Sequence, residues 1–162
     1  FDLATFSEVL EHLPSTAVLP LLTEIRRVLR PGGRLVITSP NLLALPYRLL
    51  LLAGRSPFDL PVETSFAPDT YGHIRLYAAA EIERLAEHAD WQVEAVHHRT
   101  WMLGHYDFDD ASKRWAERLL WLLDRTLGAL RPRLRDSWAM VLRRPPEAAA
   151  TSGERAPSVL GS

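Results

Sequence analysis

The chain has 162 residues, of which 47% are hydrophobic and 24% charged, as expected for a soluble globular domain. Its 19 basic and 20 acidic residues give a net charge of −1, so it has no basic excess to attract nucleic acid, and we expect no such partner. It contains no cysteine, which excludes disulfides and thiolate metal sites and fits a cytoplasmic location.

The first residues indicate a β-strand. Leu3 to Phe6 are mostly apolar, and Ser7 and Glu8 follow directly. Such a short continuous run is typical of a strand buried on both faces of a parallel sheet. Because a natural domain seldom begins within a strand, we expect the sequence to be a piece of a longer protein.

A helix is predicted next, from apolar residues at spacings of three and four: Val18, Leu21, Leu22, Ile25, Val28 and Leu29. Ser15 or Thr16 is the expected N-cap, and Pro20 is tolerated only if the helix begins just before it. Pro31-Gly32-Gly33 ends the helix, and a β-branched strand follows from Arg34 to Ser39. Strand, helix, turn and strand together predict a parallel βαβ unit.

Residues 40–72 are predicted to be an insert or an acceptor lid. Two apolar runs, interrupted by Pro46 and Arg48 and ended by Gly54, are too short for a membrane span, which needs ~20 apolar residues. Residues 55–72 contain several prolines and are expected to form a long loop. Loops of this length inside a domain usually serve a function.

The remaining elements are two helices and two strands. A helix is expected from Ala78 to about Ala89, and a strand from Trp91 to about His97. An additional helix is expected at 111–130, ended by Pro132, and a last strand at 137–143. We interpret the apolar stripe of the additional helix as core packing: Trp115, Leu119, Leu122, Leu123, Thr126, Leu127 and Leu130.

These elements define the predicted boundaries of the domain. It covers residues 1–144, and residues 145–162, rich in Ala, Pro, Ser and charge, are expected to form a disordered tail. The arginines of the 111–130 helix could alternatively place that helix on an anionic membrane surface.

Three segments carry a family resemblance. Phe1 to Leu13 combine a strand with a Glu-x-x-Glu-His ending. Ile25 to Ile37 combine a helix end, a Leu-x-Pro-Gly-Gly turn and a strand. His73 to Val93 follow a His-x-Arg-x-Tyr pattern, although Asp90-Trp91 stand where Gly-Phe is usual. In this order and spacing they resemble the C-terminal part of class I S-adenosylmethionine-dependent methyltransferases.

The resemblance implies a partial doubly wound, Rossmann-like α/β fold. Strands four to seven would be present with their helices, in the order 4-5-7-6, and the first three strands would be absent. The family binds its cofactor, S-adenosylmethionine, mainly through a Gly-x-Gly loop in the first half of the domain, and no two glycines here have that spacing. We therefore expect this piece to fold poorly and to be inactive by itself, and to bind the cofactor weakly or not at all.

The resemblance also implies site residues. Phe6, Ser7 and Glu8 would line the cofactor, because ligands of doubly wound sheets bind at the C-terminal ends of the strands. His12 and His73 are the candidate catalytic residues, because an imidazole titrates near neutrality and can take a proton from a hydroxyl acceptor. Ser7 could instead be a loop residue without contact to the cofactor, and each histidine could instead be structural.

Glu8, Glu11 and His12 form a second candidate cluster. On a helical turn the three side chains would share one face, and carboxylates with an imidazole can hold a divalent metal. We expect capping or hydrogen bonding there instead and predict no metal ligand.

The resemblance implies methyl transfer from S-adenosylmethionine, and the expected acceptor is a hydroxyl of a glycan, a lipid-linked intermediate or another small molecule. The alternative is a non-catalytic half-domain that binds a partner or a membrane surface. A nicotinamide-dependent reductase ranks last, since the chain has no Tyr-x-x-x-Lys pair and its only lysine is Lys113.

Overall fold

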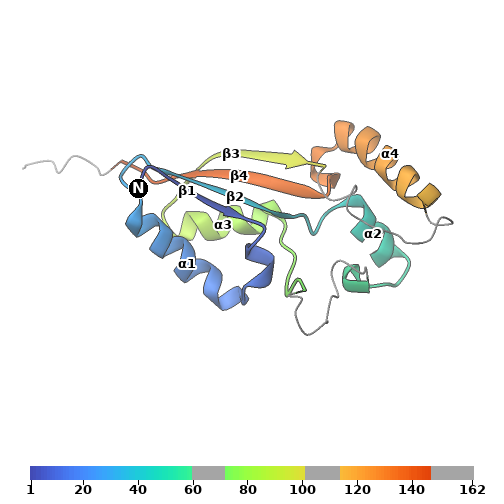
Figure 1. Ribbon diagram of the computed structural model, residues 1–162, viewed down its shortest axis with the longest axis horizontal. Coiled ribbons are helices and arrows are strands. Elements are labelled where there is room, and N and C mark those ends of the chain that lie inside the picture. The colour runs from blue at the N-terminus through green and yellow to red at the C-terminus, as the bar shows by residue number, and fades with distance from the viewer. Residues whose placement is uncertain (60–71, 101–113, 147–162) are drawn as a thin grey trace, which may run out of the picture.

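The computed structural model of the protein describes residues 1–59, 72–100 and 114–146. They form one sheet, with helices along one of its faces and further helices beyond one of its ends (Figure 1). Within these ranges no helix is both long enough and apolar enough to cross a membrane.

The sheet has four strands in the order β1-β2-β4-β3. β1 (Leu3–Ser7) and β2 (Arg34–Pro40) pair in parallel, which confirms the predicted βαβ unit. β4 (Ser137–Arg143) lies between β2 and β3 (Gln92–Arg99) and runs antiparallel to both. This is the order 4-5-7-6 that the family resemblance implied, so the predicted fold class is confirmed.

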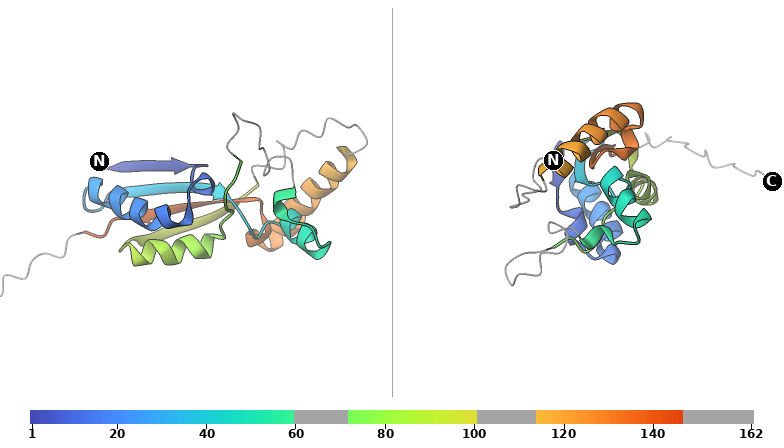
Figure 2. Two further views of the ribbon diagram at one scale, coloured as in Figure 1. Left: turned by 90° about the horizontal axis from the view of Figure 1, so that it is seen from below. Right: turned by 90° about the vertical axis from the view of Figure 1, so that its right-hand side faces the viewer.

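Two helices, α1 (Ser15–Val28) and α3 (Ala79–His88), cover one face of the sheet, as the views in Figure 2 show. The indole Nε1 of Trp91 donates to the carbonyl oxygen of Leu22 at 3.1 Å and so joins the start of β3 to α1. The largest buried side chains of this layer are apolar: Leu10, Leu22, Leu29, Leu35, Ile37, Tyr77, Ile82, Trp138, Met140 and Leu142.

The start of α1 differs from the prediction. Its N-cap is Pro14, which offers no side-chain hydrogen bond, so Ser15 and Thr16 are the first helical residues and not caps. Pro20 consequently lies in the second turn and not in the first. The position is exposed, so water can bond the carbonyl that loses its helical donor.

The turn between α1 and β2 depends on its two glycines. Gly32 has φ +80°, a conformation that side chains with a Cβ rarely adopt. A Cβ on Gly33 would lie 2.8 Å from the backbone oxygen of Arg30, closer than the chain can accommodate. The turn therefore ends the helix as predicted, and for steric reasons.

β1 is less buried than predicted. Within the described residues it pairs only with β2, and the side chain of Leu3 is 56% exposed. The expectation of a strand buried on both faces is therefore wrong for β1, because only the face toward α1 and α3 is covered. Ala4 and Phe6 point to that covered face and pack against the core.

Part of the predicted insert is helical. α2 (Leu45–Leu52) forms from the apolar run, with Pro46 in the first turn, where a missing amide hydrogen costs nothing. A short 3₁₀ turn, Pro57–Asp59, follows, whereas a loop was expected from residue 55. Ala44, Tyr47 and Leu76 form a small core under α2. Residues 60–71 lie outside the described ranges, and the lid role stays a prediction.

The later elements match the predictions except in packing. α4 (Arg114–Leu130) ends where expected, while its predicted start at 111 lies outside the described residues, as does most of the 145–162 tail. The interpretation of its stripe as core is wrong for four of its leucines, because α4 lies beyond the end of the sheet (Figure 1). The exposed leucines are Leu119, Leu122, Leu127 and Leu130.

We expect the core between the sheet and the helices α1 and α3 to contribute most of the free energy of unfolding. Leu35→Ala, in the centre of the sheet, should lower the free energy of unfolding by about 2–5 kcal/mol, because Leu35 is fully buried. Leu52→Ala is the matched control, since that side chain is 85% exposed and its loss should change stability by less than about 0.5 kcal/mol. Urea denaturation of both variants tests this, and equal losses would contradict the assignment of the core.

Candidate functional site

The candidate site lies where β1 and β2 end side by side. Ser7, the last residue of β1, pairs with Thr38 of β2. Glu8 follows with φ 51°, in the left-handed region, and its amide donates to the carbonyl oxygen of Thr38 at 3.1 Å. Residues other than glycine seldom adopt this conformation, and it turns the chain sharply out of the sheet.

The turn leads into a 3₁₀ turn, Leu10–His12, that places Glu11 in the interior. The Glu11 side chain is buried, and its Oε2 accepts a hydrogen bond from the Ser39 hydroxyl at 3.0 Å. Among the described residues no hydrogen-bond donor reaches its second oxygen, Oε1. The Glu11 backbone carbonyl accepts hydrogen bonds from the amides of Ile74 (2.8 Å) and Arg75 (3.2 Å), which brings the segment after residue 72 to the site.

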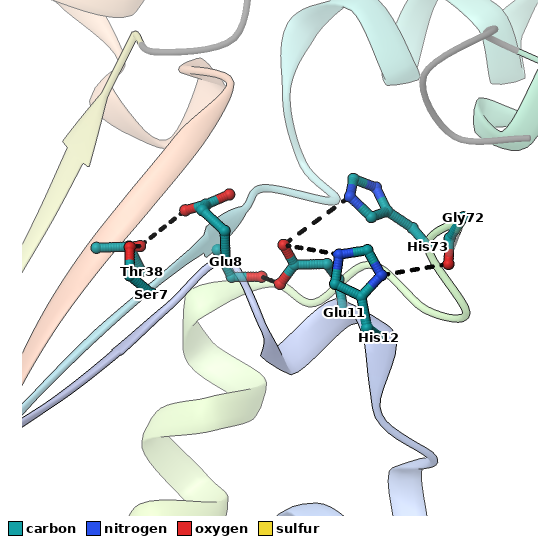
Figure 3. A network of polar contacts seen from close by, with 8 residues as sticks. Ser7, Glu8, Glu11, His12, Thr38, Gly72 and His73 are labelled. Carbon is teal, nitrogen blue, oxygen red and sulfur yellow. Dashed lines mark hydrogen bonds and ion pairs between the residues drawn. The ribbon is translucent and has the colours of Figure 1, made fainter. Parts of the chain in front are cut away.

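Two imidazoles face the unpartnered oxygen of Glu11 (Figure 3). The Nε2 atoms of His12 and His73 each lie 3.9 Å from Oε1. The two rings are tilted against each other with centroids 4.9 Å apart. His12 Nδ1 lies 3.3 Å from the carbonyl oxygen of Gly72. The structure thus brings the two predicted catalytic histidines together around one carboxylate, although they are far apart in the sequence.

The electrostatic environment of Glu11 opposes its ionisation. Burial raises the pKa of the carboxyl group, and repulsion from Glu8 raises this pKa further. Backbone hydrogen bonding, the Ser39 hydroxyl and attraction to His73 lower the pKa of Glu11 but do not offset the burial. A positive charge between Glu11 and the imidazoles would relieve this penalty.

Two of the three predicted cofactor residues, Ser7 and Glu8, lie beside a small cavity that Thr38 also lines. The Thr38 hydroxyl donates to Glu8 Oε1 at 2.7 Å and shares a 2.7 Å hydrogen bond with the Ser7 hydroxyl. A cavity of about 160 Å³ opens there, lined by Ser7, Glu8, Thr38, Arg99, Ser137, Trp138 and Ala139. It is smaller than the ~300–1,000 Å³ of typical ligand pockets, so it can hold only part of a ligand of that size. Phe6, the third predicted residue, packs against the core instead.

The expected Glu8, Glu11 and His12 face does not form. The left-handed turn at Glu8 directs its carboxylate to Thr38, away from the histidines (Figure 3). His73 takes the third place in the cluster. Sequence reasoning missed Ser39 as the residue that holds Glu11, although a polar side chain at the end of a buried strand was a usable signal.

Arg75 and Tyr77 connect the site to the helical layer. Arg75 donates to Glu81 at 2.7 Å and to the Ser15 hydroxyl at 3.1 Å, and its guanidinium carbon lies 4.7 Å from the centroid of the Tyr77 ring. The Glu81 carboxylate also accepts from the amide of Ala78 at the start of α3. These contacts join the start of α3 to α1.

Comparison with protein families assigns residues 1–96 to a model described as a methyltransferase domain. No protein with curated annotation matches the chain.

Solved structures show the same fold at low sequence identity. A methyltransferase of Methanosarcina mazei aligns with a TM-score of 0.55 at 14% identity, over 91% of this chain and 60% of its own. A methyltransferase of Archaeoglobus fulgidus aligns with a TM-score of 0.52 at 15% sequence identity, over 88% of this chain and 59% of its own chain. A methyltransferase of Mesorhizobium loti aligns with a TM-score of 0.51 at 14% sequence identity, over 89% of this chain and 62% of its own chain. All three are described as S-adenosylmethionine-dependent, and the chain spans about 60% of their length.

We expect Ser39 to stabilise the buried carboxylate. Ser39→Ala leaves Glu11 Oε2 without its donor, which should cost about 1–3 kcal/mol of unfolding free energy. Ser7→Ala is the matched control, because the Ser7 hydroxyl is exposed and water can replace its contact with Thr38. The difference between the two variants in urea denaturation measures the effect. A loss for Ser39→Ala no larger than for the control would contradict the role of Ser39.

Proposed function

The chain belongs to the methyltransferase domain family, and on that premise we propose that it forms part of an enzyme that methylates a hydroxyl group of a glycan, a lipid-linked intermediate or another small molecule. One observation supports the choice of a hydroxyl. The chain places two imidazoles and a buried carboxylate together at the C-terminal ends of parallel strands, the edge at which doubly wound sheets bind ligands.

S-adenosylmethionine is the cofactor of this enzyme. Bound at the end of β1, it would supply a methyl group that is activated by a sulfonium. The residues at the end of β1 fit such a group. Glu8 offers a carboxylate to a positively charged ligand, and the Ser7 and Thr38 hydroxyls add polar contacts beside it. Ser7 and Glu8 therefore remain the cofactor residues of the proposal, while Phe6 contributes by packing beneath them.

Methyl transfer requires alignment and exclusion of water more than it requires acid or base chemistry. A hydroxyl acceptor adds one demand, because its proton must leave when the oxygen attacks. We assign this step to the cluster of Glu11, His12 and His73. His73 is only 10% exposed and His12 30%, so an acceptor at the cluster would be partly shielded from water.

The proposal concerns the whole enzyme. The chain spans about 60% of the similar structures, and the cavity beside Glu8 is too small for a complete cofactor. We therefore propose that residues 1–162 by themselves bind S-adenosylmethionine weakly and transfer no methyl group.

The catalytic assignment predicts a selective loss of turnover. In the full-length gene product, His73→Gln should lower kcat with a hydroxyl acceptor by about 10²-fold or more, because general acid–base groups contribute 10²- to 10⁴-fold. His97→Gln, an exposed residue of β3, is the control and should leave kcat unchanged. Release of S-adenosylhomocysteine with a panel of sugar, lipid-linked and phenolic hydroxyls is the measurement. Equal turnover of the two variants, or transfer to amines alone, would refute the assignment.

A second role in membrane-surface contact is favoured by α4. Its exposed Leu119 and Leu122 lie on the same helix as the exposed Arg118 and Arg125, a combination that suits an anionic lipid surface. We expect the protein to co-sediment with vesicles containing phosphatidylglycerol and not with neutral phosphatidylcholine vesicles. Leu119→Glu combined with Leu122→Glu should abolish this binding. Equal sedimentation with and without vesicles would exclude the role.

A further inference from the structure

The cluster of Glu11, His12 and His73 has the spacing of a metal site. One ligand atom from each residue lies within 4.8 Å of the others, and both histidine Nε2 atoms are 3.9 Å from Glu11 Oε1. Two ligand atoms of a tetrahedral ion, each at ~2.1 Å from it, lie about 3.4 Å apart. The side chains of Glu11, His12 and His73 would therefore have to move closer together to hold an ion between them.

The buried oxygen of Glu11 is an independent indication. Oε1 has no hydrogen-bond partner among the described residues, and the Glu11 side chain is 1% exposed. A buried carboxylate oxygen without a partner is costly, and native proteins compensate such oxygens with a donor, an ion or water. The distance of 3.9 Å to each imidazole is too long for a direct hydrogen bond.

The surrounding contacts orient the ligands. Ser39 holds Oε2 at 3.0 Å and leaves Oε1 directed at the histidines (Figure 3). His12 Nδ1 lies 3.3 Å from the carbonyl oxygen of Gly72, which can only accept, so in the neutral imidazole Nε2 carries the lone pair on the side of Oε1. Two lone pairs that face one another repel unless a cation lies between them. A backbone carbonyl behind a ligating imidazole is also the usual outer shell of a metal site.

We propose that Glu11, His12 and His73 bind a divalent transition-metal ion, with Zn²⁺ as the closest match to two imidazoles and one carboxylate. Such a nitrogen-rich set disfavours Mg²⁺ and Ca²⁺, which prefer oxygen ligands. Glu8 is not a ligand, since its Oε1 accepts from Thr38, but its negative charge acts on Glu11 and favours a cation nearby.

Three protein ligands leave at least one position of a tetrahedral ion open. An acceptor hydroxyl bound at that position would release its proton to a water molecule more readily, because the ion would stabilise the oxyanion that remains. The imidazoles would then act as ligands, and the ion would carry out the activation assigned above to the cluster. This consequence rests on the proposed function, whereas binding of the ion does not.

Metal binding is tested directly on the chelator-treated protein with the ion alone. Titration calorimetry with ZnCl₂ should give one equivalent bound, and CoCl₂ should give the visible absorption of a tetrahedral cobalt site. Glu11→Gln and His73→Gln should each weaken binding at least tenfold, and Ser39→Ala should weaken it by about 10- to 100-fold as an outer-shell change. His97→Gln is the matched control and should retain binding within about threefold.

The outcomes separate the two proposals. Absence of binding by protein that circular dichroism shows to be folded would overturn the metal site, as would binding that survives both Glu11→Gln and His73→Gln. His12→Gln, at a partly exposed position, keeps the test valid if Glu11→Gln does not fold. Binding of Zn²⁺ by the full-length gene product, without methyl transfer to any hydroxyl acceptor, would support the metal site and refute the proposed function. If the enzyme binds no Zn²⁺ and its methyl transfer is unaffected by a chelator, the metal site is refuted and the proposed function is supported.

Discussion

The parallel pairing of β1 and β2 is the constraint on which the candidate site depends. Its register sets Ser7 beside Thr38, so the residues that follow each strand emerge at one edge of the sheet. Glu11 then lies within hydrogen-bond distance of Ser39, although the two are far apart along the chain. A shift of one residue would turn Ser39 to the opposite face and remove the donor that holds the carboxylate.

The buried Glu11 links the strands to the segment that carries His73. Its backbone carbonyl binds the amides of Ile74 and Arg75, and its side chain faces both imidazoles. One residue therefore fixes the two histidines relative to each other and to the sheet. The cost of burying its carboxylate has no structural compensation at Oε1 among the described residues, which is typical of positions retained for chemistry and not for stability.

The sequence alone determined the elements whose signals are local. Apolar periodicity located α1, α3 and all four strands, and Pro31-Gly32-Gly33 located the turn, because only glycine accommodates φ +80° and the close approach to Arg30. The strand order followed from the resemblance of three ordered motifs. His12 and His73 could be chosen as reactive residues by chemical type, and Ser7 and Glu8 by their place after a strand.

Only the tertiary structure decided what packs against what. Helical periodicity in α4 shows an apolar face but not whether a partner covers it, and Leu119 and Leu122 are exposed. The grouping of Glu8, Glu11 and His12 assumed a helical turn, whereas the left-handed Glu8 directs its carboxylate to Thr38. Glu11, His12 and His73 come together through pairing between distant segments, and no local pattern encodes such a contact. Local chemistry thus determined which residues can react, and the register of the sheet determined which of them meet.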